Sequence, residues 1–150
     1  MRFRLLFLAL SLCVSHITNA APHKDKACFE SASQRYGIPV VLLKSISRTE
    51  SGGNNAAMGR NKNGTYDIGH MQINSAWLPT LSKFGITQAN LINSPCTNTH
   101  VGAWILASNF RQYGYNWRAV GAYNARSPNK AIRYARKVAT NMRKEEVLVE

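Results

Sequence analysis

The chain has 150 residues, of which 19 are Lys or Arg and only 7 are Asp or Glu, and its formal net charge is +12. A chain of this length has room for one compact domain with one hydrophobic core and excludes two such domains. The basic balance favours a polyanionic partner, such as a cell-wall polymer, a lipid surface or nucleic acid, but charge alone does not choose among them.

Residues 1–20 have the pattern of a secretory signal. Arg2 and Arg4 precede an apolar run over 5–14, and a polar stretch ends at Ala20. The apolar run is about ten residues long, whereas a helix that crosses a bilayer needs about 20. We therefore expect cleavage after Ala20, export to the periplasm or beyond, and no stable membrane insertion. A retained anchor is the less favoured alternative.

The mature chain, residues 21–150, is expected to form a single domain with its core over about 27–144. Loss of Cys13 leaves two cysteines, Cys28 and Cys96, which is an even count in a chain sent to an oxidising compartment. We expect these two to form one long-range disulfide. The rival interpretation, a two-cysteine metal site, lacks nearby paired ligands, and the histidines show no ligand spacing. No metal or cofactor is therefore expected.

Helical periodicity dominates the first third of the mature chain. It predicts one helix over 27–36 and a second that starts at Pro39 and ends before Gly52-Gly53. The stretch 54–74 is different, because it is rich in Asn and Gly and contains an Asn63-Gly64 pair. That composition predicts a small β-hairpin element or an ordered loop.

Further helices are predicted in the second half of the chain. They cover 75–84, a short turn at 88–91, a long apolar helix over 98–113, a short segment over 117–123, and a basic amphipathic helix beyond Pro128. The helix over 98–113 is the most hydrophobic and is expected to be the central one. The predicted fold class is therefore α+β, mostly α-helical, with a small β-element.

Two carboxylates, Glu50 and Asp67, lie away from the chain ends and the first helical turns. Glu50 follows Ile46 by four positions and Leu42 by eight, which places its side chain on the buried face of the second helix. Burial disfavours a charged carboxylate and raises its pKa toward the working pH, as a general acid requires. The alternative is a side chain at the helix end that bends into solvent.

Three short blocks of residues follow one another along the chain. They are Glu50-Ser51-Gly52-Gly53, Gly69-His70-Met71-Gln72-Ile73-Asn74 and Ala122-Tyr123-Asn124-Ala125. In this order and at this spacing they resemble the lytic transglycosylases related to goose-type lysozyme. The likeness covers roughly 27–134 and extends to small specialised members that accompany type III and type IV secretion, conjugation and type IV pilus systems. Any one block is weak evidence, but the three together with the cysteine pair are strong evidence.

The resemblance implies a lysozyme-like fold that cleaves the β-1,4 bond between N-acetylmuramic acid and N-acetylglucosamine and forms a 1,6-anhydro ring without water. Glu50 would first act as the acid and then as the base. The blocks also imply substrate-binding roles for Ser51, Gly69, His70, Met71, Gln72, Tyr123 and Asn124, with the Tyr123 hydroxyl orienting Glu50. Simpler roles stay open for three of them: a backbone bond for Ser51, and core packing for Met71 and Tyr123.

Three further residues have uncertain roles within this resemblance. Asp67 is expected to face Glu50, where it would stabilise positive charge on the sugar or permit hydrolysis; its alternative is to cap a turn. His70 stands where the family usually has leucine, so it either lies beside the cleft and titrates there or points outward. Arg126 replaces a common glycine and either contacts peptide-stem carboxylates or covers the surface.

The expected function is therefore that of a monomeric peptidoglycan-cleaving enzyme. Its partners would be glycan strands and an envelope-spanning secretion, conjugation or pilus complex for which it opens the wall locally. The alternatives are general wall turnover, a muramidase-type hydrolase using Glu50 and Asp67, and a non-catalytic wall-binding assembly protein; the presence of Glu50 argues against the last. Nucleic acid is not an expected partner, because the Lys and Arg residues lack interleaved aromatic residues.

Overall fold

The computed structural model describes residues 28–147, so the predicted signal over 1–20 lies outside the described residues. The helices are α1 (Phe29–Tyr36), α2 (Val40–Ser51), α3 (Leu78–Leu81), α4 (Gln88–Asn93), α5 (Pro95–Tyr113), α6 (Trp117–Asn124) and α7 (Pro128–Val147). The strands are β1 (Met58–Arg60), β2 (Tyr66–Ile68) and β3 (Ile73–Asn74). Within this part of the chain, no helix is both long enough and apolar enough to span a bilayer.

Helix α2 begins and ends where its sequence predicts. Pro39 precedes its first residue, and Gly52 ends it in the left-handed conformation with φ of 67°. The Gly52 N–H donates to the Arg48 carbonyl, which closes the last turn. Because the helix ends at Ser51, Glu50 lies in its last turn. From there its side chain contacts Tyr134 of α7.

The segment 54–74 forms a three-stranded antiparallel sheet in the order β1-β2-β3. Asp67 sits at its centre, opposite Gly59 on β1 and Asn74 on β3. The Asn63-Gly64 pair lies in the connection between β1 and β2, where Gly64 has φ of 82°. The predicted β-hairpin element is therefore present, and it carries Asp67 on its middle strand.

The predicted helix over 75–84 is broken into three short pieces. A 3₁₀ turn over Ser75–Trp77 is followed by α3 and by a second 3₁₀ turn over Ser82–Phe84. Pro79 has no backbone N–H and cannot continue the hydrogen bonds of the turn before it, so the helix restarts at Leu78. The long helix α5 also starts earlier than predicted, because the Ser94 side chain caps it by accepting from the Thr97 N–H at 3.1 Å.

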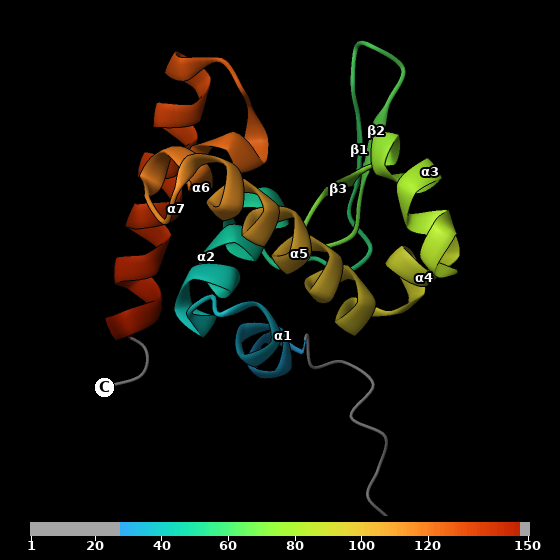
Figure 1. Ribbon diagram of the computed structural model, residues 1–150, viewed down its shortest axis with the longest axis horizontal. Helices are drawn as coiled ribbons and strands as arrows, with labels where there is room; N and C mark the ends of the chain where they lie inside the picture. The colour runs from blue at the N-terminus through green and yellow to red at the C-terminus, as the bar shows by residue number, and fades with distance from the viewer. Residues whose placement is uncertain (1–27, 148–150) are drawn as a thin grey trace, which may run out of the picture.

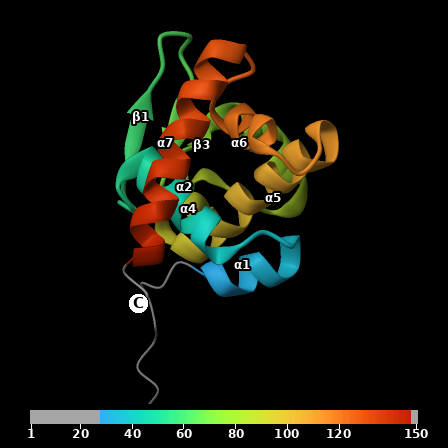
Figure 2. The same cartoon turned by 90° about the vertical axis from the view of Figure 1, so that its left-hand side faces the viewer.

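Helix α5 crosses the middle of the molecule, with the strands at one side of it and α6 and α7 at the other (Figure 1). Its buried side chains Val101, Ile105 and Leu106 belong to one core with Leu43 and Ile46 of α2. Helix α7 lies along α2 (Figure 2) and is joined to it by hydrogen bonds and by a 2.7 Å ion pair between Arg48 and Glu145. The prediction of a mostly helical α+β fold is confirmed.

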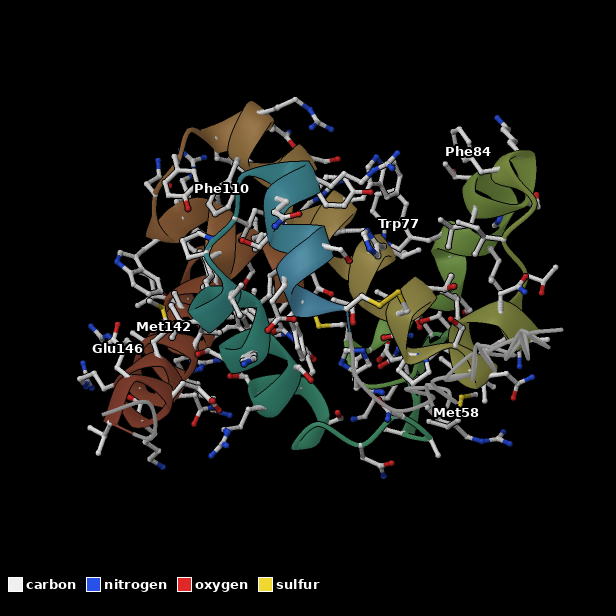
Figure 3. The ribbon with its side chains drawn as sticks, turned by 90° about the horizontal axis from the view of Figure 1, so that it is seen from below. Met58, Trp77, Phe84, Phe110, Met142 and Glu146 are labelled. Carbon is white, nitrogen blue, oxygen red and sulfur yellow. A yellow bond between two sulfur atoms is a disulfide. The ribbon has the colours of Figure 1, made fainter. Side chains whose placement is uncertain are left out.

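The Cys28–Cys96 disulfide is present, as predicted, and joins the start of α1 to the first turn of α5 (Figure 3). It links positions 68 apart in the sequence. In the chain-entropy description, a covalent loop of this size stabilises the fold by roughly 4 kcal/mol. The bond holds the base of the molecule, on α1 and α5, and neither cysteine lines the cleft described below.

Candidate active site

Glu50, from the last turn of α2, faces a cleft of about 550 Å³. Most of the side chains around this cleft carry amides, hydroxyls or charges; they are Glu50, Asn61, Lys62, Asn63, Thr65, Asp67, Gln72, Asn74, Trp77, Ile105, Tyr123, Asn124 and Lys130. Figure 1 shows the β1–β2 hairpin on one side of this region and the α6–α7 corner on the other. Amides, hydroxyls and aromatic side chains, here Trp77 and Tyr123, are groups that bind a neutral polar chain such as a glycan.

Burial raises the pKa of the Glu50 carboxyl from 4.5 to about 7. The nearby negative charge of Asp67 acts in the same direction, whereas a hydrogen bond from Tyr134 acts in the opposite one. The Tyr134 hydroxyl donates that bond to Oε1 of Glu50 at 2.6 Å. Glu50 therefore keeps its proton to a higher pH than an ordinary carboxyl does, and a general acid working near neutral pH requires this property.

Tyr134 is the functional residue that the sequence prediction missed. It comes from α7, 84 positions after Glu50, and only 6% of it is exposed. Its ring stacks on that of Tyr123, with centroids 6.4 Å apart. A signal existed in the sequence, because Tyr134 precedes Val138 by four positions and so lies on the buried face of the amphipathic helix.

Asp67 lines the same cleft as Glu50 and is held by two asparagine amides. The Asn74 side chain donates to Oδ1 at 2.7 Å, and the Asn61 side chain donates to Oδ2 at 2.9 Å. Each carboxylate oxygen therefore accepts one hydrogen bond, which fixes the orientation of the group across the sheet. Asp67 thus lines the same cleft as Glu50, and its assistance in catalysis stays a prediction.

Tyr123 lines the cleft, but its hydroxyl does not reach Glu50. It donates instead to the Met71 carbonyl at 2.9 Å, so it joins α6 to the turn that precedes β3. The orienting role that the resemblance gives to Tyr123 is filled geometrically by Tyr134, in the second turn of α7. Asn124 and Gln72 also line the cleft, as expected.

His70 and Met71 lie in the interior, and neither lines the cleft. His70 is only 1% exposed, and its ring nitrogens are within 2.8 Å of the Ser47 hydroxyl and 3.1 Å of the Thr99 hydroxyl. Burial lowers its pKa, so the ring stays neutral at physiological pH. The expectation that His70 titrates beside the cleft or points outward is therefore corrected; it is a core residue, and so is the fully buried Met71.

The backbone of the Gly69–Gln72 turn explains this placement. Gly69 and Gln72 both have positive φ, 71° and 48°, and the Gln72 N–H donates to the Gly69 carbonyl at 3.0 Å. A strand would send alternate side chains to opposite faces, but this turn sends His70 and Met71 inward together. The residue pattern of this block predicts a strand and gives no sign of a tight turn.

Gly69 and Ser51, which were also predicted to bind the sugar, contact other parts of the protein instead. A Cβ atom at Gly69 would lie 2.3 Å from Nδ2 of Asn98, so this glycine makes room for a core side chain and not for sugar. The Ser51 hydroxyl donates to the His70 carbonyl at 2.9 Å, which was its alternative prediction, and it does not line the cleft. Together they connect the end of α2, the turn and α5.

Among residues 28–147, no three His, Cys, Asp or Glu side chains gather where they could hold a metal ion. The site itself supplies a carboxyl of raised pKa, a tyrosine hydroxyl bonded to it and a second carboxylate held in place by amides. That arrangement fits the protonation and cleavage of an acetal bond.

Comparison with known proteins assigns these features to one family. Residues 27–146 match the family described as the transglycosylase SLT domain. The chain is 42% identical over 121 residues to "Invasion protein IagB" of Salmonella typhimurium, covering 78% of this chain and 76% of that protein. It is 44% identical over 111 residues to "Protein IpgF" of Shigella flexneri, covering 73% of each.

A third relative is "X polypeptide" of Escherichia coli, which is 38% identical over 116 residues. That match covers 77% of this chain and 68% of the relative. These matches confirm the resemblance to lytic transglycosylases drawn from the three blocks, including the lysozyme-like fold class.

Proposed function

Since the chain belongs to the transglycosylase SLT domain family, we propose that it is a peptidoglycan lytic transglycosylase. It would cleave the β-1,4 bond between N-acetylmuramic acid and N-acetylglucosamine and leave a 1,6-anhydromuramoyl end. The observation that carries this proposal is the buried Glu50 carboxyl, whose pKa is raised to about 7 on the wall of a polar cleft.

In the first step, Glu50 gives its proton to the glycosidic oxygen, the bond from this oxygen to C1 breaks, and positive charge develops at C1. Because Tyr134 occupies Oε1, Oε2 is the oxygen available for this transfer. The same Tyr134 bond stabilises the carboxylate that is left behind, since a hydrogen bond to a charged acceptor is stronger than one to a neutral acceptor.

In the second step, the Glu50 carboxylate removes the proton from the C6 hydroxyl of the same muramoyl sugar, and O6 forms a bond to C1. The products are an anhydro ring and a new free hydroxyl on the leaving sugar, so no water is consumed and Glu50 regains its proton. The nucleophile is tethered to the reacting sugar, which supplies the advantage of an intramolecular reaction without a second carboxylate to activate it.

Asp67 would assist by electrostatic stabilisation. Its carboxylate is fixed by Asn61 and Asn74 on the same cleft as Glu50, where a negative charge favours the positive charge that develops on the sugar. The same arrangement supports the alternative of a muramidase-type hydrolase, in which water replaces the C6 hydroxyl as nucleophile. A non-catalytic wall-binding assembly protein is the remaining alternative.

The cellular role that we propose is local opening of the wall for an envelope-spanning complex, after export to the periplasm. One relative is named an invasion protein, and a basic chain with a disulfide suits an oxidising, polyanion-rich compartment. General wall turnover is the alternative role.

The test is the mass of the products that the purified chain releases from peptidoglycan sacculi. A transglycosylase releases anhydromuropeptides, each lighter by one water than the corresponding reducing muropeptide. Reducing products would identify a hydrolase, and no release by the folded wild-type chain would identify a binding protein. Digestion in water enriched in heavy oxygen checks the assignment, because only hydrolysis places the label at C1.

A further inference from the structure

A second hollow, of about 270 Å³, adjoins the cleft at Glu50. The two hollows share Glu50, Asn124 and Lys130 in their walls. The second one, which we call the side hollow, continues between α2 and α7 and is also lined by Thr49, Arg133, Tyr134 and Lys137. A substrate bound at Glu50 can therefore extend in two directions, into the polar cleft or into the side hollow along α7.

The charge of the side hollow differs from that of the cleft. Lys130, Arg133 and Lys137 follow one another at three- and four-residue spacing, so they lie on one side of α7. The same side carries Tyr134 and Asn141, whose polar groups bond to Glu50 and Thr49 of α2 at 2.6 and 2.9 Å. These contacts fix the orientation of α7 and direct the cationic row toward the side hollow.

The three cations are free to bind an anion. Within the described part of the chain, the one ion pair joins Arg48 to Glu145, and none involves the cationic row. The single carboxylate in the wall of the side hollow is Glu50, whose pKa burial raises to about 7 and which Tyr134 already contacts. Asp67 lines the cleft and not the side hollow.

We propose that the side hollow binds the carboxylates of the peptide stem on the muramoyl residue being cleaved, through Arg133 and Lys137 with Lys130 at the junction. This inference rests on the proposed function, because a muramoyl sugar whose glycosidic oxygen reaches Glu50 must carry its stem away from a point beside that residue. A glycan continuing there would need neutral polar partners, whereas the stem carries several carboxylates and matches three unpaired cations.

Arg126 does not contribute to this site. It lies on the connection between α6 and α7, is exposed, and faces a separate, largely apolar hollow with Trp117 and Ile132. The cationic contact to stem carboxylates that the sequence suggested for Arg126 is therefore assigned to α7, one to three turns further along the chain.

The experiment compares two substrates with one enzyme. The purified chain is given glycan strands with intact stems and the same strands after an amidase has removed the stems, and kcat/KM is measured for each. The variant Arg133→Gln/Lys137→Gln removes two of the cations. Its matched control, Arg136→Gln/Arg143→Gln, removes two exposed charges of the same helix that do not line the side hollow.

We expect the ratio of kcat/KM for stem-bearing over stem-free strands to fall about tenfold in the Arg133/Lys137 variant, as expected for two exposed charge contacts, and to stay unchanged in the control. Added salt should reduce the wild-type ratio as well. An unchanged ratio in the Arg133/Lys137 variant, or an equal loss on both substrates, would overturn the inference while leaving the proposed function intact. If the folded wild-type chain cleaves neither substrate, the proposed function fails first.

Discussion

The Tyr134 hydroxyl donates a 2.6 Å hydrogen bond to Oε1 of Glu50 and thereby joins α7 to the last turn of α2. This bond opposes the two influences that raise the pKa of Glu50, which are burial and the charge of Asp67. The pKa of Glu50, the proposed proton donor, therefore depends on Asp67 of β2 and Tyr134 of α7 as well as on burial, and changing either residue should move the pH dependence in a known direction.

Removing the tyrosine hydroxyl tests the first of these influences. Tyr134→Phe deletes the bond that lowers the pKa of Glu50, so the loss of activity at alkaline pH should move to higher pH. The maximal rate should fall about tenfold, since a hydrogen bond to a charged group contributes about 1.5 to 3 kcal/mol. The measurement is the rate of muropeptide release across a pH series.

Tyr123→Phe is the control for that experiment. Its hydroxyl donates to the Met71 carbonyl and not to Glu50, although the two tyrosine rings stack. The pH at which activity is lost on the alkaline side of the pH–rate profile (its alkaline limb) should therefore be the same as in the wild type, even if the maximal rate changes. A limb that moves equally in both variants would show that ring packing, and not the hydrogen bond, sets the pKa.

Neutralising Asp67 should have the opposite effect on the pH profile. Asp67→Asn removes a negative charge that raises the pKa of Glu50, so the alkaline limb should move to lower pH. The rate should also fall by about 100-fold if the carboxylate stabilises the charged sugar. If the Asp67→Asn variant cleaves at the wild-type rate, Asp67 has only a structural role, in which it accepts hydrogen bonds from Asn61 and Asn74.

The raised pKa of Glu50 also predicts a pH-dependent cost in stability. Between about pH 4.5 and 7 the unfolded chain has lost this proton while the folded chain keeps it, so stability falls as the pH rises through this window. Glu50→Gln removes the cost and should stabilise the fold above pH 7 by on the order of 2 kcal/mol.

Urea unfolding at two pH values measures this difference. Below pH 4.5 the wild type and the Glu50→Gln variant should be equally stable, because Glu50 is then protonated in both the folded and the unfolded chain. Glu146→Gln, at an exposed position on α7, serves as the control. A Glu50→Gln variant that is no more stable than the wild type at pH 8 contradicts the assigned burial of the carboxyl.

Asn98 should be among the most sensitive residues of the core. Its side chain donates to the carbonyls of Ile68 and Leu91 at 2.9 and 3.1 Å and accepts from the Met71 N–H at 2.8 Å. Asn98→Ala leaves these backbone groups without a partner and should cost about 3 kcal/mol in the free energy of unfolding. Asn109→Ala, which loses one 3.3 Å bond from the same helix, should cost much less.

Local signals were sufficient to predict most of the helices and the burial of Glu50. Pro39, Gly52 and the spacing of Leu42, Ile46 and Glu50 all lie within one helix and its caps, so periodicity places the carboxyl without knowledge of the rest of the fold. The disulfide could also be predicted from the sequence, because the mature chain keeps two cysteines and they can pair in only one way.

The contents of the cleft were harder to predict because they depend on contacts between distant segments. The bond from Tyr134 to Glu50 spans 84 positions, and no periodic pattern selects one buried tyrosine over another as its donor. His70 was misplaced for a different reason, since the positive φ angles of Gly69 and Gln72 turn the chain where a strand pattern would alternate. Gly69 is explained both by its positive φ and by the Asn98 side chain that fills the space beside it.

The account depends most on Glu50 as the proton donor, and the direct measurement is the rate at which Glu50→Gln releases soluble muropeptides from sacculi. The variant keeps the size and the Tyr134 contact but cannot donate the proton, so its rate should fall at least about 100-fold while its thermal unfolding stays cooperative. A folded Glu50→Gln variant that solubilises sacculi at the wild-type rate would contradict the account.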